Sequence, residues 1–321
     1  MSSLSLAPPR SAVLRAAVLR HRPALRTLLG VLAGFLVLLG VTGYYIHAGL
    51  DRSGAAGCDM ALRTCNERWK EFLRGSGPEL MVGGNVTYFL GGALGAFVGS
   101  PLLAREFEHG TVRFAWTQGA GRTRWTVGGL VVGGSALAVA TALVAAALSW
   151  WIEPMAVHGG RFTPLVFTSA PPALVGRVLL VFALSALAGV VLRRTVVALG
   201  IGVVASVVTT LVAESLRFHY RAPLEDTLHT LAQTSLDHRW EGGIWVTDPA
   251  GNRLDLGRLY DLGGDYYGAQ KLLSEGGYSL HESYQPDSRY WTFQFIEFGW
   301  MTLLAVALCA AAVWWVRRRA F

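Results

Sequence analysis

Charged residues are scarce in this chain, and their scarcity excludes an ordinary soluble domain. Of the 321 residues, 15% are charged and 52% are hydrophobic, and the mean hydropathy is +0.40. Soluble domains carry roughly a quarter charged residues. So many apolar side chains require an apolar solvent, and we therefore expect an integral membrane protein.

Lysine is almost absent. The chain has two lysines, Lys70 and Lys271, and neither follows a phosphate-binding glycine loop. P-loop hydrolysis of ATP needs the pattern Gly-x-x-x-x-Gly-Lys-Ser/Thr, so this chain does not carry it. The patterns His-Glu-x-x-His and Gly-x-Ser-x-Gly are missing as well. We expect a protein that is not an enzyme and that has no catalytic residues.

Cysteine is also rare, with Cys58, Cys65 and Cys309 as the only examples. The first two flank a short polar segment, and the third lies in an apolar run. Cys58 and Cys65 form a disulfide only if their loop faces an oxidising compartment, and two free thiols fit the spacing equally well. No second Cys-x-x-Cys or His-rich element accompanies the pair, so no metal site is expected.

Six apolar stretches are long enough to cross a bilayer. They cover residues 28–48, 85–104, 127–150, 172–192, 195–213 and 291–316. The first contains about 21 residues, which favours a retained transmembrane helix over a cleaved signal peptide. Only Arg193 and Arg194 separate the fourth and fifth stretches, and this predicts a tight hairpin.

The net charge of +7 comes from arginines at the ends of the apolar stretches. Cytoplasmic segments of membrane proteins are enriched in Lys and Arg. This rule places residues 1–27, the loop 105–125, Arg193–Arg194 and the tail after the last span inside the cell, so both termini are cytoplasmic. Because the arginines serve as anchors, we expect no nucleic-acid partner. Abundant Ala, Gly and Arg indicates a GC-rich bacterial genome, hence a multi-pass protein of the bacterial plasma membrane.

The outer segments differ in length. Residues 51–79 are expected to form a polar loop and 153–171 a short one, whereas 217–290 are too many for a simple connection. In that long segment, residues 245–256 alternate around an Asp-Pro-Ala-Gly-Asn turn, which predicts a β-hairpin. We interpret the segment as a small extracytoplasmic cap.

These boundaries divide the chain into four parts. A basic N-terminal segment precedes a block of five spans, which the cap separates from the last span and its basic tail. The four parts cover residues 1–27, 28–216, 217–290 and 291–321.

Ionisable side chains are rare within the spans. Arg177, Glu214 and Glu297 lie in or beside them and map to their outer ends. Snorkelling of these side chains to the interface accounts for them without a function. The alternative is that Arg177 pairs with Glu297 or Glu214 at the outer mouth of a pathway.

Glycines recur every fourth residue in the spans. Gly91, Gly95 and Gly99 share one helix face, and shorter repeats occur at residues 30 and 34 and at 129 and 133. Such faces allow helices to approach closely in lipid. We expect packing within the chain in preference to a subunit interface.

The loop between the second and third spans carries the most informative pattern. Thr111 can cap a short amphipathic helix that ends before Gly119 and Gly121. This helix either lies on the lipid headgroups or provides a docking surface for a cytoplasmic partner.

At this loop the chain resembles the type-2 ABC exporter permeases. Members commonly carry an acidic-x-x-x-Gly-Thr-x-Arg stretch followed by Thr-x-x-x-x-Arg between their second and third spans. The matching residues here are Glu106, Gly110, Thr111, Arg113, Thr117 and Arg122. The stretch 284–297 also resembles the entry to the last helix in actinobacterial members. One departure is Gly128-Gly129, where many members have a lysine.

The resemblance implies an all-α membrane fold of the type V ABC exporter kind and a coupling helix that sits in a separate ATP-binding subunit. The implied coupling residues are Glu106, Glu108, Gly110, Thr111, Arg113, Thr117, Gln118 and Arg122. ATP and Mg²⁺ would bind the partner subunit, and no cofactor is expected on this chain. A second permease chain, identical or related, would complete the pathway, and the basic N-terminal segment would lie against anionic membrane lipid.

The function implied is the membrane-spanning permease of an ATP-driven exporter. A protein of another class is the alternative: a membrane-embedded sensor or accessory protein that acts through its outer segment and needs no ATPase.

Overall fold

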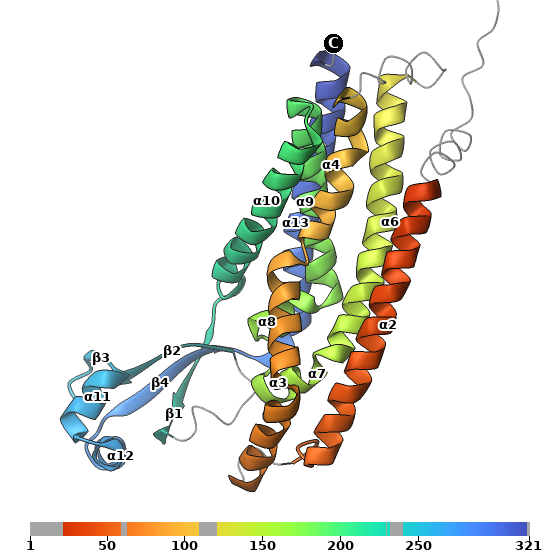
Figure 1. Ribbon diagram of the computed structural model, residues 1–321. Helices are drawn as coiled ribbons and strands as arrows, with labels where there is room; N and C mark the ends of the chain where they lie inside the picture. Colours follow the sequence, from red (N-terminus) through yellow and green to blue (C-terminus); the bar gives the residue numbers. More distant parts are fainter. Residues whose placement is uncertain (1–21, 59–62, 109–120, 229, 232–239, 320–321) are drawn as a thin grey trace, which may run out of the picture.

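The chain forms a bundle of long helices with a small cap at one end (Figure 1). The computed structural model describes residues 22–58, 63–108, 121–228, 230–231 and 240–319. Within them, six helical segments are long and apolar enough to cross a membrane. The prediction of six spans is confirmed, and the protein is mostly helical.

Each predicted span lies on one long helix or, for the second span, on a pair of helices. The long helices are α2 (Arg22–Ser53), α3 (Arg63–Leu90), α4 (Ala93–Glu108), α6 (Arg122–Trp151), α9 (Pro171–Leu192), α10 (Thr195–Arg217) and α13 (Tyr290–Arg319). Two short helices, α7 (Glu153–Gly159) and α8 (Pro164–Ser169), connect α6 to α9. The predicted hairpin is present: Arg193 ends α9 in the left-handed conformation, at φ 56°, and α10 begins at Thr195.

The second crossing consists of α3 and α4, which meet at Gly91 and Gly92. The prediction of a polar loop over residues 51–79 is wrong, because α2 continues to Ser53 and α3 begins at Arg63. Cys65, Trp69 and Phe72 are buried, and their spacing of four and three residues defines one face of a helix. The polar residues between them cover the opposite face and give this half of α3 the composition of a loop.

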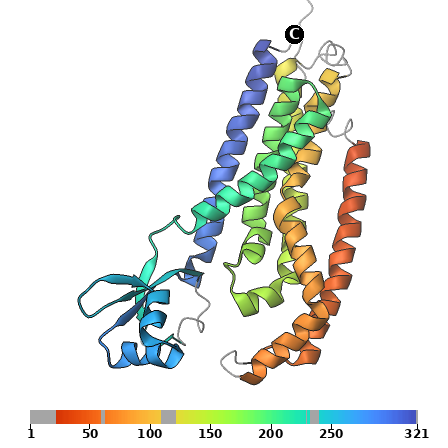
Figure 2. The same cartoon turned by 60° about the vertical axis from the view of Figure 1, so that its left-hand side comes forward.

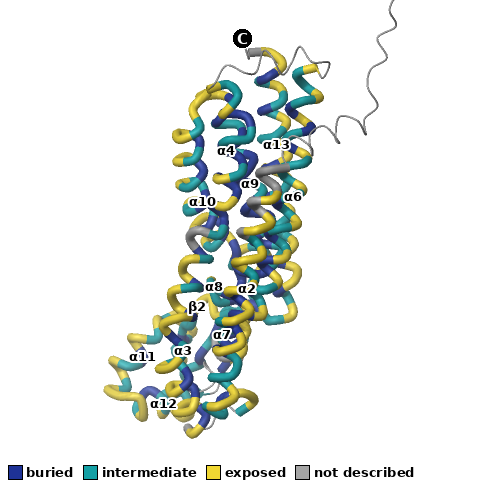
Figure 3. Tube along the Cα trace, turned by 45° about the vertical axis from the view of Figure 1, so that its right-hand side comes forward, coloured by how far each residue is buried: buried dark blue, intermediate teal, exposed yellow. Residues whose placement is uncertain are grey.

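Helix α9 is the centre of the bundle. It packs against α4, α6, α10 and α13, and Figure 3 shows buried residues along it. Helix α2 lies at the edge, against α3 and α6.

The glycine stripe of the second crossing explains how closely α4 and α9 approach. A Cβ at Gly95 would collide with the Val178 carbonyl oxygen, and one at Gly99 with the Phe182 carbonyl oxygen. These two contacts are made within the chain, as expected. The glycines at 30, 34 and 129 differ, because no atom lies within 4 Å of their Cβ positions.

The cap (residues 224–285) is a four-stranded antiparallel sheet with two helices on one face. Its strands β1 (Leu224–Leu228), β2 (Trp240–Thr247), β3 (Arg253–Asp255) and β4 (Ser279–Gln285) lie in the order β1-β4-β2-β3. Strands β2 and β3 are the predicted hairpin. Helices α11 (Leu256–Gly263) and α12 (Tyr266–Ser274) complete a core that contains Leu228, Val246, Leu259, Ala269 and Leu280. The expectation of an all-α fold therefore holds for the bundle and not for the cap.

The cap adjoins the ends of α10 and α13 (Figure 2). Hydrogen bonds and aromatic contacts join it to the bundle there. The Gln285 side-chain nitrogen donates to the carbonyl oxygens of Phe218 and Arg221, at 3.0 and 2.8 Å. Trp240 of β2 stacks on Phe162, which belongs to a cluster that also contains Phe293 of α13. Strand β1 follows α10, and strand β4 leads into α13. These contacts therefore attach the sheet to the ends of both helices.

A disulfide joins Cys58 to Cys65, with the two Cα atoms 5.6 Å apart. It closes the connection between α2 and α3. Cys309 of α13 is a free thiol.

Replacing Gly95 by alanine is expected to destabilise the bundle by about 1–3 kcal/mol, because the added methyl group must push the α9 backbone away. Gly34→Ala is the matched control, since its Cβ position is open and alanine favours the helix. Thermal unfolding of the purified protein in detergent measures both. Equal melting temperatures for the two variants would contradict the close approach of α4 and α9.

Candidate functional site

Two arginines and one glutamate are buried inside the bundle towards the cap. Arg177 of α9 is 1% exposed, and Arg217 of α10 and Glu297 of α13 are 0% exposed. Such groups are costly within a membrane protein and are retained where they stabilise a structure or serve a function. With Tyr88, Glu214 and Gln294 they form what we call the buried polar cluster.

Arg177 is stabilised chiefly by the ends of two helices. Its Nη1 donates to the Tyr88 carbonyl oxygen at 3.1 Å and to the Thr210 hydroxyl at 2.9 Å, and its Nη2 donates to the Thr168 carbonyl oxygen at 3.0 Å. Tyr88 lies in the last turn of α3 and Thr168 in the last turn of α8. Carbonyl groups in a last turn lack helical partners and carry partial negative charge. The guanidinium therefore satisfies one carbonyl at the break in the second crossing and one at the end of α8.

Arg217 and Glu297 form a buried ion pair. The Nε and Nη2 atoms of Arg217 donate to the two carboxylate oxygens, at 3.1 and 3.3 Å. The guanidinium also lies over the Phe167 ring, 3.9 Å from its centroid. Burial and the negative charge of Glu297 raise the pKa of Tyr220 to about 12, so this neighbouring phenol stays protonated. The pair joins α10 to α13 directly below the cap.

Glutamine and tyrosine side chains complete the cluster. Gln294 accepts a hydrogen bond from the Ala173 amide at 3.0 Å and donates one to the Phe167 carbonyl oxygen at 2.8 Å. It thereby joins the end of α8 to the first turn of α9. The Tyr88 hydroxyl donates to the Glu214 carboxylate, which links α3 to α10.

The structure brings the three predicted outer-mouth residues into one region, but it changes their partners. The hydrogen bonds of Arg177 go to Tyr88, Thr168 and Thr210 instead of to Glu214 or Glu297. Snorkelling is the wrong explanation for Arg177 and Glu297, because both are enclosed by protein. Arg217 is the residue that sequence reasoning missed. It follows the fifth apolar stretch, and nothing local indicates a partner 80 residues away.

A second group of arginines lies at the end of the bundle far from the cap, where α4, α9 and α13 end and α6 and α10 begin (Figure 1). We call this the basic end, defined by Arg105, Arg122, Arg124, Arg193, Arg194, Arg317 and Arg318. Of the predicted coupling residues, Glu106 and Glu108 close α4, and Arg122 opens α6. The others, Gly110, Thr111, Arg113, Thr117 and Gln118, lie outside the described residues.

Glu108 has a structural partner at the basic end. Its carboxylate accepts hydrogen bonds from the Thr195 amide at 3.2 Å and the Thr195 hydroxyl at 2.7 Å. Thr195 is the first residue of α10, and a negative charge there satisfies amides that lack helical partners. Glu108 thus attaches the end of α4 to the hairpin between α9 and α10.

Comparison with known proteins decides the class of the molecule. Residues 29–217, which include the first five spans, match the family described as ABC-2 membrane transporter related. The chain belongs to this family. Proteins of the ABC-2 family are typically non-catalytic membrane subunits, and with six candidate spans this member is a multi-pass membrane protein. No curated protein and no solved structure matches the chain.

Removing one partner of the buried ion pair is expected to destabilise this ABC-2 family member. Glu297→Ala leaves the Arg217 charge buried without its carboxylate, at a cost of about 3–5 kcal/mol. Replacing both residues by leucine removes both charges and is expected to recover most of the loss. Melting temperatures in detergent distinguish the three proteins. A double variant less stable than Glu297→Ala would contradict the pairing.

Proposed function

We propose that the chain is the permease subunit of an ATP-driven exporter. Membership of the ABC-2 family supports this proposal. The observation that carries it is that α4 ends and α6 begins at the basic end of the bundle. In the sequence, the loop 109–120, which holds most of the coupling motif, joins these two helix ends. A partner on that side could move α4 through this loop.

Two independent features support a cytoplasmic position for the basic end. Arginines concentrate on the cytoplasmic side of membrane proteins, and disulfides persist in oxidising compartments outside the cytoplasm. Seven arginines gather at the basic end, away from the cap, whereas Cys58 and Cys65 lie at the opposite end of α2 and α3. We therefore place both termini in the cytoplasm and the cap outside the plasma membrane.

The contacts of α4 support a route from the coupling loop to the buried polar cluster. One end of α4 adjoins the loop and is attached to α10 through Glu108. The other end begins beside Gly92, whose Cβ position contacts the Arg177 side chain. Helices pack too tightly to deform continuously and instead shift as rigid bodies between discrete arrangements. A push on the loop would therefore move α4 relative to α9 and act on the break that Arg177 stabilises.

This mechanism requires chemistry from a partner. An ATP-binding subunit would bind ATP and Mg²⁺, and a second permease chain, identical or related, would complete the pathway. In the alternative, the chain is a membrane-embedded sensor or accessory protein. It would then act through the cap and need no ATPase.

The coupling assignment predicts a specific loss of ATPase association. Arg113→Glu is expected to reduce the amount of co-expressed P-loop ATPase recovered with the tagged chain at least tenfold. Arg318→Glu is the matched control, since it makes the same charge change at the basic end outside the loop. Glu108 is unsuitable for this test, because its replacement would also disturb α10.

Quantitative staining of the two subunits after affinity purification gives the measurement. Equal recovery of the ATPase with Arg113→Glu and Arg318→Glu would count against the coupling loop. A wild-type chain that retains no P-loop ATPase would favour the sensor or accessory protein.

A further inference from the structure

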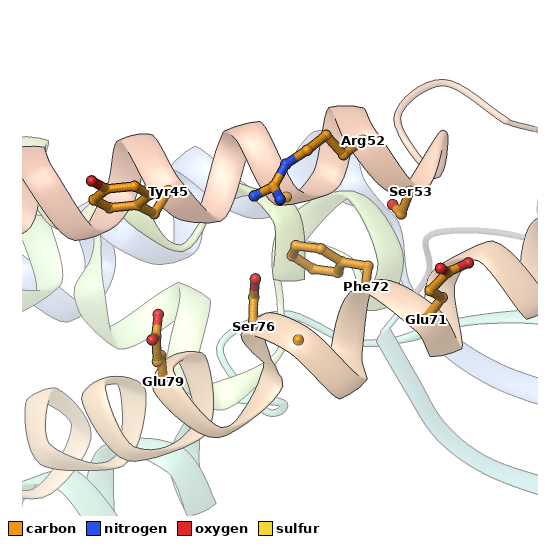
Figure 4. Close-up of a pocket in the computed structure, with 9 residues that line it drawn as sticks. Tyr45, Arg52, Ser53, Glu71, Phe72, Ser76 and Glu79 are labelled. Atoms are coloured by element: carbon orange, nitrogen blue, oxygen red, sulfur yellow. The ribbon is translucent and has the colours of Figure 1, made fainter.

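A groove of about 490 Å³ lies between α2 and α3 near their connection. Figure 4 shows side chains from both helices facing each other across this space. The lining residues are Tyr45, Gly49, Arg52, Ser53, Glu71, Phe72, Gly75, Ser76 and Glu79. It is separate from both the buried polar cluster and the basic end.

The groove presents charges of both signs. Nε of Arg52 donates to the Ala48 carbonyl oxygen at 3.0 Å, which orients the guanidinium and leaves its two terminal nitrogens for a ligand. Among the described residues, neither Glu71 nor Glu79 has a hydrogen bond or ion-pair partner. A ligand that carries both an anionic and a cationic group would pair with Arg52 and with one of the two carboxylates at the same time.

The position of the groove indicates where such a ligand comes from. The candidate span of α2 ends at Ser53, so the groove lies at the end of this span, at the boundary between hydrocarbon and headgroups. Before the groove, α2 exposes apolar side chains, including Val37, Leu38 and Val41. At this depth the most concentrated molecules are phospholipids, with headgroups at the level of the groove and acyl chains along α2.

We propose that the groove binds the headgroup of a phospholipid with a primary amine, such as phosphatidylethanolamine. Its phosphate accepts hydrogen bonds from the terminal nitrogens of Arg52, a strong charge-assisted contact. Its ammonium group donates to Glu79 or Glu71, and Tyr45 packs beside it as interfacial aromatic residues do. An anionic lipid without an amine would leave both carboxylates unpaired and repelled by its phosphate.

The walls of the groove are fixed before a lipid arrives. The Cys58–Cys65 disulfide closes the α2–α3 connection, and Arg68 donates to the Gly54 carbonyl oxygen at 3.3 Å. On the other side of α2, Trp151 donates to the Thr42 hydroxyl at 3.0 Å. A fixed site loses less conformational freedom when it binds a ligand. Selective lipid retention is therefore expected even after purification in detergent.

Steric filling of the groove tests the proposal without disturbing the fold. No atom lies within 4 Å of the Cβ position of Gly75, so Gly75→Leu extends into the groove and also favours the helix. Gly40→Leu is the matched control, because its Cβ position on α2 is equally open and lies outside the groove. Glu71→Gln combined with Glu79→Gln removes the negative charges and keeps the side-chain volume.

The measurement is the lipid retained by the purified full-length chain from an equal mixture of phosphatidylethanolamine and phosphatidylglycerol, counted by native mass spectrometry. Wild type and Gly40→Leu are expected to retain the amine lipid at least fivefold over the glycerol lipid. Gly75→Leu and the double glutamine variant are expected to lose this preference.

Three outcomes would overturn the proposal. The first is equal retention of the two lipids by the wild-type chain, and the second is an unchanged preference in Gly75→Leu. The third is displacement of the lipid by an equimolar amount of free phosphoethanolamine, which would show a site for a soluble zwitterion. None of these outcomes bears on ATPase association, because the groove lies near the α2–α3 connection, at the opposite end of the bundle from the basic end.

Discussion

The constraint on which the bundle depends is the burial of positive charge among apolar helices. Arg177 donates hydrogen bonds to carbonyl oxygens at the ends of α3 and α8, and Arg217 forms an ion pair with the Glu297 carboxylate. Each set of contacts also fixes the position of the helices that supply it. The first stabilises the break between α3 and α4, and the second holds α10 against α13. The central helix α9 can then pack its backbone at Val178 and Phe182 against glycines on α4.

The six crossings were predictable because lipid imposes a simple rule on length and composition, and the limits of α9 and α10 follow from Pro171 and the Arg193–Arg194 pair. The family resemblance was visible in the motif of the loop between the second and third spans. Most residues of this motif lie outside the part of the chain that the structure describes. The first half of α3 was missed, because its polar face masks the buried positions of Trp69 and Phe72. Neither the length nor the polar composition of residues 63–79 indicated a helix.

The candidate site was only partly predictable, for a related reason. Sequence identified Arg177, Glu214 and Glu297 as ionisable groups near the spans, but pairing is a property of three-dimensional packing. Arg217 reaches Glu297 across 80 residues, and Gln294 reaches Phe167 across 127. In the cap, residues 245–256 carry a local turn signal, whereas β1 and β4 pair across more than 50 residues. Contacts of such long range leave no periodic pattern in the sequence.

The sheet of the cap also limits how the molecule can open. Strand β1 follows α10, strand β4 precedes α13, and the two strands are hydrogen-bonded neighbours. Neighbouring strands lie about 4.8 Å apart, so the sheet holds the cap-side ends of these two helices together. Gln285 strengthens this attachment, because its side chain donates to the carbonyl oxygens of Phe218 and Arg221, which follow α10. Any widening on the cap side must then occur elsewhere in the bundle. Among the described long helices, α2, which packs on α3 and α6 at the edge, has the fewest contacts to break.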